Sequence, residues 1–136
     1  MSVAISTSVT GADFAHVVAR TREVLKDNGF GVLTEIDMQA TLKAKIGADM
    51  ERYLILGACS PEFAHQAVSV EKRIGVLLPC NVVVREDPDD PANVHIEAMN
   101  PQLMDQVVDN PALSPIAAQV AEKIRNTVDT LAAELR

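Results

Sequence analysis

The spacing of apolar residues changes several times along the chain, and each change predicts a new helix or strand. Loose alternation over residues 3–9 indicates a strand, and apolar residues three and four apart over residues 14–25 indicate a helix. Asn28 and Gly29 provide the left-handed ending that is common to helices. Alternation returns over residues 30–37, which predicts a half-buried strand with Phe30, Val32 and Ile36 on one face.

The middle of the chain is predicted to form the centre of a sheet. The run RYLILGAC, residues 52–59, shows no alternation of polar and apolar residues, as expected for a central strand covered on both faces. Ser60 and Pro61 predict the start of a helix, because serine accepts hydrogen bonds from exposed amides and proline suits the first helical turn. Two further strands, 76–84 and 94–99, are predicted to form a hairpin around the turn EDPDDPAN.

The C-terminal part is predicted to be helical. A short helix surrounds Leu103, and a long helix that packs along the sheet is indicated by an unbroken apolar stripe: Ile116, Val120, Ile124, Val128, Leu131 and Leu135. The chain has 136 residues, of which 48% are hydrophobic, so it can bury one substantial core. The pattern therefore predicts one domain over residues 1–136, of the α+β class, with two layers.

Composition and charge narrow the classes of partner. The formal net charge of −7 repels phosphate backbones, and one tyrosine with three phenylalanines offers few stacking surfaces, so nucleic-acid binding is disfavoured. The longest apolar run falls far short of a membrane span. The segment MSVAISTSVTGAD lacks the basic start and apolar stretch of a signal peptide, so we expect a cytoplasmic protein with reduced cysteines.

A proline inside the apolar run GVLLPCNVVVRED points to a candidate site. Pro79 cannot donate to a sheet ladder, so the chain is expected to bend or bulge there. Cys80 and Asn81 follow at once, and bulges often re-aim side chains. Cysteine is commonly a small buried hydrophobe, so the bend can be purely structural; alternatively, it places Cys80 and Asn81 at a binding site.

A second cysteine strengthens the interpretation as a site. Cys59 ends the strand before Ser60, where helix amides favour an anionic sulfur. If strands 52–59 and 76–85 are neighbours, the sulfurs of Cys59 and Cys80 converge and become candidate ligands for a soft metal. The 20 intervening residues do not match the paired Cys-x-x-Cys pattern of zinc sites.

The histidines are less informative. His65 shares the polar side of its predicted helix with Ser69 and Lys72, which favours a solvated position, although it is the histidine nearest to Cys59 in sequence. His95 and Glu97 share one face of a strand, where they are acid-base candidates only if that face lines a cavity.

Three functions remain open on these grounds. The leading hypothesis is a small binding domain that holds a small ligand or soft metal near Cys59, Cys80 and Asn81, with His65 as a further candidate. The second is a thiol-dependent enzyme or redox protein in which Cys80 reacts and His65 or His95 acts as the base. The third is a structural interaction module in which the motif only stabilises the bend.

The central segment YLILGACSPEFAHQAVSVEKRIGVLLPCNVVVRED resembles the core of the family called domain of unknown function 302. The resemblance depends on a combination of motif residues: Tyr53, Pro61, Gly75, Leu78, Pro79, Cys80 and Asn81. It implies a TATA-binding-protein-like α+β fold, in which helices cover one side of a curved, mainly antiparallel sheet, and it implies a homodimer. It implies no reaction, catalytic residue or cofactor.

Overall fold

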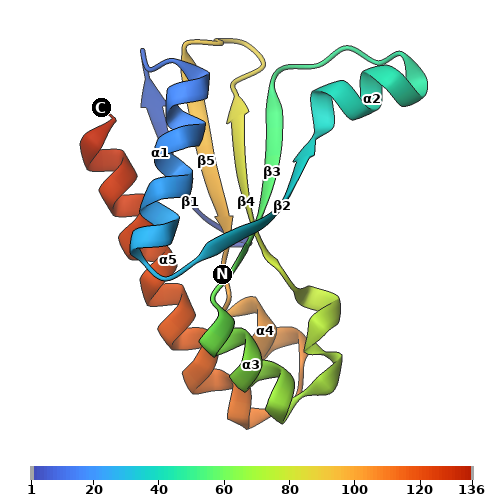
Figure 1. Cartoon of the computed structure of the whole chain (residues 1–136), viewed down its shortest axis with the longest axis vertical. Coiled ribbons are helices and arrows are strands. Elements are labelled where there is room, and N and C mark those ends of the chain that lie inside the picture. Colours follow the sequence, from blue (N-terminus) through green and yellow to red (C-terminus); the bar gives the residue numbers. More distant parts are fainter. Residues whose placement is uncertain (1, 136) are drawn as a thin grey trace.

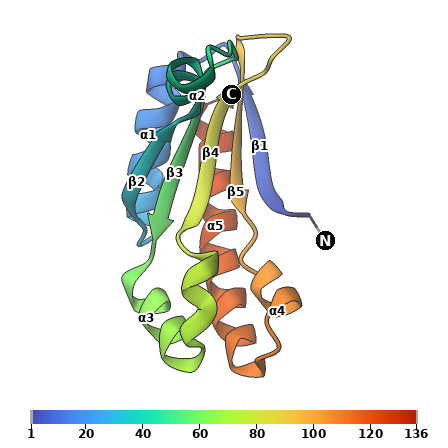
Figure 2. The same ribbon diagram turned by 90° about the vertical axis from the view of Figure 1, so that its right-hand side faces the viewer.

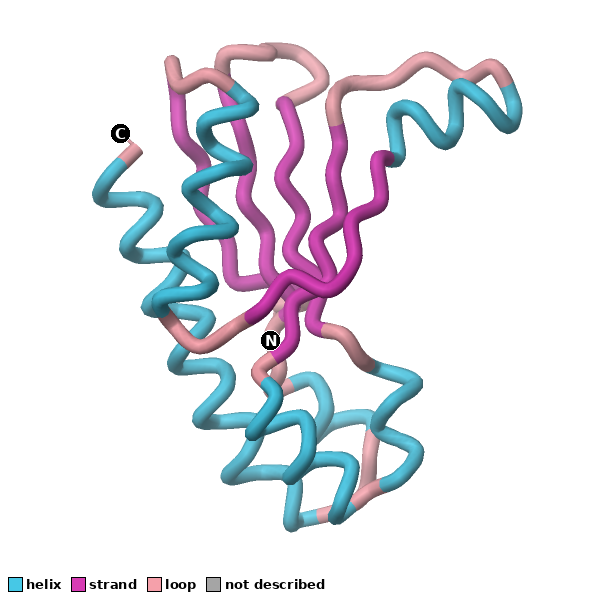
Figure 3. The backbone as a smooth tube through the Cα atoms, viewed as in Figure 1, coloured by secondary structure: helices cyan, strands magenta, loops and turns pink. Residues whose placement is uncertain are grey.

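The computed structural model describes residues 2–135, which form an antiparallel sheet with helices against one face and at one end (Figure 1, Figure 3). The strands are β1 (Ala4–Thr10), β2 (Gly31–Asp37), β3 (Tyr53–Cys59), β4 (Cys80–Glu86) and β5 (Asn93–Met99). The α-helices are α1 (Phe14–Asp27), α2 (Met38–Ile46), α3 (Pro61–Val70), α4 (Leu103–Val107) and α5 (Ser114–Glu134). Two 3-10 helices, η1 (Lys72–Leu77) and η2 (Pro111–Leu113), complete the chain.

The five strands lie in the order β1-β5-β4-β3-β2, and every neighbouring pair is antiparallel. The predicted α+β class and the predicted hairpin, formed by β4 and β5, are confirmed. The prediction that residues 52–59 form the central strand was wrong, because β4 occupies the centre and β3 lies beside it. Both strands carry continuous apolar runs, so hydrophobicity alone does not distinguish the central strand from its neighbour.

Helices α1 and α5 cover one face of the sheet, while no helix covers the opposite face in the part of the chain described (Figure 2). The covered face supplies fully buried side chains such as Leu56, Val84 and Ile96. The predicted apolar stripe of α5 packs against them through Ile124 and Leu131. This burial is the main stabilising contribution to the fold. Within residues 2–135, no helix has the length and apolar character needed to cross a membrane.

Strand β2 departs from the predicted alternation. Val32 pairs with Ala58, the pairing then shifts between Val32 and Thr34, and Ile36 pairs with Ile55. A bulge adds one residue and reverses the alternation after it, so Val32 and Ile36 lie on opposite faces rather than on one. The side chain of Ile36 is consequently 46% exposed.

The segment before β4 is a 3-10 helix rather than the first half of the predicted strand 76–84. The amide of Leu78 donates to the carbonyl of Gly75 at 3.2 Å, and Ile74 is fully buried. The strand begins at Cys80, directly after Pro79, because proline has no N–H to donate to the ladder. The peptide bond before Pro79 is cis. The expected break at Pro79 is therefore present, as a strand start rather than a bulge.

The first turn of α3 also differs from expectation. Pro61 occupies the predicted first position, but among the described residues the Ser60 hydroxyl forms no capping hydrogen bond. Its backbone carbonyl instead accepts from the amide of Ala64 at 2.8 Å. The Ser60 hydroxyl is thereby left beside the cavity described next.

Candidate functional site

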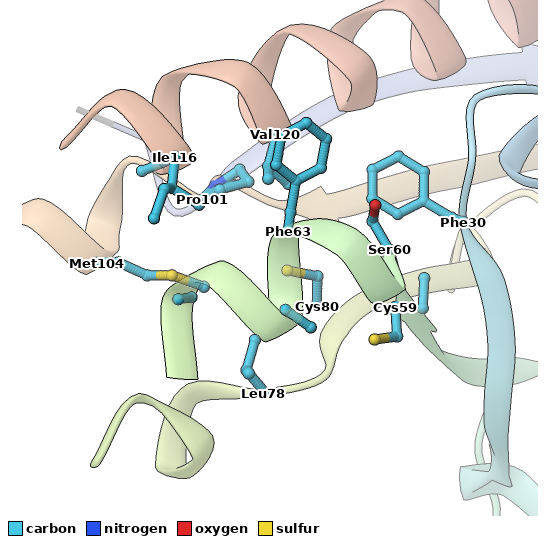
Figure 4. A pocket seen from close by; sticks show the side chains of 14 residues that line it. Phe30, Cys59, Ser60, Phe63, Leu78, Cys80, Pro101, Met104, Ile116 and Val120 are labelled. Atoms are coloured by element: carbon cyan, nitrogen blue, oxygen red, sulfur yellow. The ribbon is translucent and has the colours of Figure 1, made fainter. Parts of the chain in front are cut away.

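A small cavity lies where the end of β3 and the start of β4 meet the helices α3, α4 and α5 (Figure 4). Its volume is about 30 Å³. Its fourteen lining residues are almost all apolar, with Phe30, Phe63 and Val120 on one side. Apart from three sulfur atoms, the side chain of Ser60 is the one polar group in this lining as far as the chain is described. The cavity is therefore apolar, and its volume is close to that of a single water molecule.

The fold brings the two cysteines to this cavity. Strands β3 and β4 are neighbours, as predicted, and Ala58 pairs with Cys80; Cys59 is the next residue and the last of β3. Both cysteines are free thiols, and both line the cavity. Cys80 is 6% exposed, whereas Cys59 is half-buried. One thiol is therefore enclosed by the core and the other is partly accessible to solvent.

The environment of Cys80 disfavours its thiolate. Burial raises the pKa of Cys80 to about 11, and the nearby Cys59 adds to the increase. At pH 7 roughly one Cys80 side chain in ten thousand is ionised. Among residues 2–135, no histidine donates a hydrogen bond to either sulfur. Cys80 is therefore a protonated, buried thiol when nothing is bound to it.

A third sulfur atom reaches the same cavity and was missed by the sequence analysis. Met104, in α4, extends toward α3 and lines the cavity together with Cys59 and Cys80 (Figure 4). It is 6% exposed and belongs to a small core cluster that also contains Cys80 and Ile74. The sequence gives little signal for this role, because a methionine in a short apolar helix normally indicates core packing.

Two predicted site residues lie outside the cavity. Asn81 is exposed in β4 and pairs with Gly57, which places its side chain on the uncovered face of the sheet. His65 is exposed on α3, in agreement with the solvated position favoured by its polar neighbours. Neither side chain lines the cavity around Cys80. The structure thus brings together Cys59 and Cys80 but not the other two candidates.

His95 and Glu97 share the uncovered face of the sheet, as expected from their spacing. Glu97 accepts hydrogen bonds from Arg85 at 2.7 and 3.2 Å, and His95 lies 2.8 Å from Asp87. This face carries ion pairs rather than a cavity around the two residues.

The sulfur residues do not form a conventional zinc site. Structural zinc sites hold the ion with four ligands from cysteine, histidine or acidic side chains. Within the described residues, no group of three or more such side chains is placed to hold a metal ion. A metal bound in this cavity would be limited to the two thiols and the thioether.

Comparisons with known proteins agree with the motif resemblance. Residues 5–131 match the family described as "Domain of unknown function DUF302". The chain is also similar to a solved structure, that of an uncharacterized conserved protein DUF302 from Bacillus stearothermophilus. The two sequences are 26% identical, the TM-score is 0.85, and the alignment covers 95% of this chain and 98% of that one. No curated protein matches the chain.

Proposed function

The chain belongs to the DUF302 family, and we propose that the cavity lined by Cys59, Cys80 and Met104 binds a single Cu(I) ion. The observation that carries the proposal is that the lining of one apolar cavity includes three sulfur-bearing residues, which come from three separate elements. Thiolate and thioether ligands favour soft ions, of which Cu(I) accepts a small number of sulfur ligands. The apolar lining supports the same choice, because it offers no competing oxygen ligand other than the Ser60 hydroxyl.

The size of the cavity separates an ion from an organic ligand. Pockets for drug-sized ligands occupy roughly 300–1,000 Å³. The cavity beside Cys80 has about 30 Å³, which suits one ion and excludes a molecule of that size without rearrangement. Of the two ligand classes considered, the soft metal is therefore the better supported.

A thiol enzyme is less well supported by the same site. Catalytic cysteines need a lowered pKa or an adjacent base. Burial instead raises the pKa of Cys80 to about 11. Metal binding overcomes this cost, because the ion replaces the proton on the sulfur. Because the proposed site needs reduced thiols, it fits the cytoplasm.

The test of the proposal is an anaerobic titration of the reduced protein with Cu(I) held by the coloured chelator bicinchoninate. We expect the protein to withdraw one Cu(I) per chain from the chelator. Cys59→Ser and Cys80→Ala should each abolish the withdrawal, because one thiol and one thioether form an incomplete site. Met104→Leu should weaken binding less, since it removes a neutral ligand and conserves the side-chain volume.

The matched control is Ser60→Ala, which alters the same cavity without removing a sulfur and should retain copper. Circular dichroism of each variant checks that the fold is intact. Failure of the wild-type protein to compete for Cu(I), or equal competition by the Cys59→Ser/Cys80→Ala double variant, contradicts the proposal.

Self-association is a second candidate property, favoured by the arm formed by β2 and α2. In Figure 1, α2 projects away from the body of the protein. Of its nine residues, all described, none is buried, and Ile46 at its end is 74% exposed. Leu33 and Ile36 on β2 are also exposed apolar residues. Short helices gain most of their stability from packing an apolar side against other structure, so this arm lacks a covering surface.

We infer that the covering surface is a second copy of the chain. The arm carries Lys45 and also Lys43, which pairs with Asp49 at 2.7 Å, whereas the β4–β5 hairpin carries acidic residues between Glu86 and Asp90. A symmetric pair lets each arm meet an oppositely charged hairpin of the other copy, as isologous dimers allow. The family resemblance implies a homodimer, and this inference adds which surface would form its contact.

Replacing Ile46 with aspartate should shift the protein toward the monomer, with the dimer dissociation constant rising roughly hundredfold or more, because the charge would enter an apolar contact. Light scattering coupled to size-exclusion chromatography measures the change. Val76→Asp is the matched control, since Val76 is 87% exposed but lies in η1, at the end of the protein far from α2 (Figure 1). A monomeric wild-type protein, or an equal effect of both variants, would rule out the arm as the contact.

A further inference from the structure

A serine, a histidine and an aspartate are connected in series on the uncovered face of the sheet. Ser8 Oγ lies 2.6 Å from His95 Nδ1, and His95 Nε2 lies 2.8 Å from Asp87 Oδ2. Ser8 is exposed, while the side chains of His95 and Asp87 are 17% and 27% exposed. The array is independent of the sulfur cavity, since none of its three members lines that cavity.

The sheet register holds these residues together. Ser8 in β1 is paired directly with His95 in β5, so the two side chains project from the same face. Asp87 follows β4 at the start of the hairpin, where its amide donates to the carbonyl of Asn93 at 2.8 Å. The other carboxylate oxygen of Asp87 accepts from the amide of Asp89 at 2.9 Å. The carboxylate is therefore oriented toward His95 by two backbone contacts.

The two contacts of the His95 ring indicate which of its nitrogens can take the proton of Ser8. Nε2 of His95 donates its proton to the carboxylate of Asp87, which leaves Nδ1 as the acceptor for the Ser8 hydroxyl. The contact with His95 is the main cause that lowers the pKa of Asp87, so the carboxylate remains ionised near neutral pH. This is the order of groups found where a serine hydroxyl is activated: a hydroxyl, a base, and a group that orients the base.

The backbone amide of Ser8 is available to a bound molecule. The amide of Gly11 donates to the carbonyl of Ala92, and the carbonyl of Val3 accepts from the amide of Asn100. The backbone N–H and C=O groups of the odd-numbered residues of β1 therefore point toward β5. Antiparallel ladders alternate, which turns the N–H of Ser8 toward the outer edge of β1. In the described part of the chain, that edge of the sheet pairs with no further strand. The N–H of Ser8 is thus free to donate to an oxyanion formed beside the Ser8 hydroxyl.

The charged groups near the array are already paired. Arg85 lies opposite His95 in β4, but its guanidinium donates to both oxygens of Glu97 at 2.7 and 3.2 Å. This pairing keeps Glu97 from competing with Asp87 for the histidine. Tyr53, beyond Arg85 on β3, is the next titratable group on this face.

We propose that Ser8 is a nucleophile toward activated acyl and organophosphorus compounds, with His95 as its general base and Asp87 as the residue that positions His95. In the acyl case, Ser8 Oγ bonds to the carbonyl carbon while its proton passes to His95 Nδ1. The bond to the leaving oxygen then breaks, and that oxygen takes the proton from His95. Water later hydrolyses the Ser8 ester by the same route, giving a carboxylic acid. The reaction consumes no oxidant or reductant and uses no metal ion.

The open setting of Ser8 defines the class of substrate. None of the four best-formed pockets in residues 2–135 is lined by Ser8, His95 or Asp87, and Ser8 is exposed, so we expect little selection of a compact ligand by shape. It can act on compounds whose leaving group is good enough to depart without a second acid, such as phenyl esters. Extended molecules that lie along the free edge of β1 would gain backbone hydrogen bonds there.

Incubation with a fluorophosphonate, followed by intact mass and peptide mapping, tests the proposal. Ser8 Oγ replaces fluoride on phosphorus, and the proton leaves through His95. We expect one adduct, on Ser8, forming at least about a hundredfold faster than on Ser6, a range typical of general-base catalysis. Ser6 is the internal control because it is exposed on the same strand and face but pairs with Glu97.

His95→Gln and Asp87→Asn should each slow the adduct on Ser8 without moving it to another residue, whereas Ser6→Ala should leave the rate unchanged. Hydrolysis of p-nitrophenyl acetate should follow the same order. Thermal melts confirm that the variants fold, and Ser8→Ala, at an exposed position, provides a second check. Equal labelling of Ser8 and Ser6, or a rate on Ser8 insensitive to both His95→Gln and Asp87→Asn, overturns the proposal.

Discussion

The affinity for Cu(I) is expected to fall about tenfold for each pH unit between pH 9 and pH 6 through the Cys80 proton alone, roughly a thousandfold in total. The reason is the buried position of this thiol. Its pKa of about 11 means that Cys80 carries its proton throughout this range when no metal is bound. A bound Cu(I) requires the thiolate, so every ion that binds releases this proton.

The sign of the effect follows from this exchange of a proton for a metal ion. Lowering the pH raises the concentration of the released proton and therefore shifts the equilibrium toward the metal-free protein. Raising the pH favours binding up to about pH 11, where Cys80 would ionise without metal.

Chelator competition at a series of pH values measures this slope, after correction for the pH dependence of the chelator itself. Ser60→Ala, which keeps all three sulfur side chains, should keep the wild-type slope. An affinity that does not change between pH 9 and pH 6 would show that Cys80 is not a ligand.

Gly57→Ala is expected to destabilise the protein by about 1–3 kcal/mol, the range typical of overpacked cores. Gly57 lies in β3 on the face opposite α1 and α5, and it is buried there by its neighbours. A Cβ at this position would collide with Oγ1 of Thr34 and lie 2.9 Å from Cγ of Pro79. Only a glycine therefore allows β2 and the Pro79 bend to approach β3 this closely.

Chemical denaturation measures the loss of stability, and two variants make it specific. Gly31→Ala is the matched control, because a Cβ on that strand glycine meets no atom within 4 Å; its effect should stay within about 0.5 kcal/mol. Thr34→Ala should partly rescue Gly57→Ala by removing the oxygen that the new methyl group meets. Equal stabilities of Gly57→Ala and Gly31→Ala would mean that Thr34 and Pro79 do not pack against Gly57 as described.

The hydrophobic pattern predicted most of the elements because their spacing is regular. The stripe from Val120 to Leu131 in α5 and the alternation in β5 both correspond to buried positions. The pattern failed in β2, where one extra residue after Val32 reversed the faces. It also failed before Cys80, where a run of apolar residues suits a 3-10 helix as well as a strand. In both places tertiary packing decided the local structure.

The candidate site was predictable only in part. Cys59 and Cys80 could be linked from the sequence because the strands predicted to contain them, 52–59 and 76–85, could be neighbours, as they are in the structure. Met104 could not be assigned to the site from the sequence, because the contacts that bring α4 to the cavity are tertiary and the composition of α4 does not indicate them. Ser8 is separated from His95 by 87 residues, so only the pairing of β1 with β5 reveals their contact.

X-ray absorption of the Cu(I)-loaded protein tests the sulfur cavity most directly. The protein grown with selenomethionine should show copper surrounded by two sulfur atoms and one selenium atom, and Met104→Leu should remove the selenium signal. These neighbours would identify Cys59, Cys80 and Met104 as the ligands. A copper ion surrounded by nitrogen or oxygen atoms, or a spectrum unchanged in the Cys59→Ser/Cys80→Ala variant, would contradict the account.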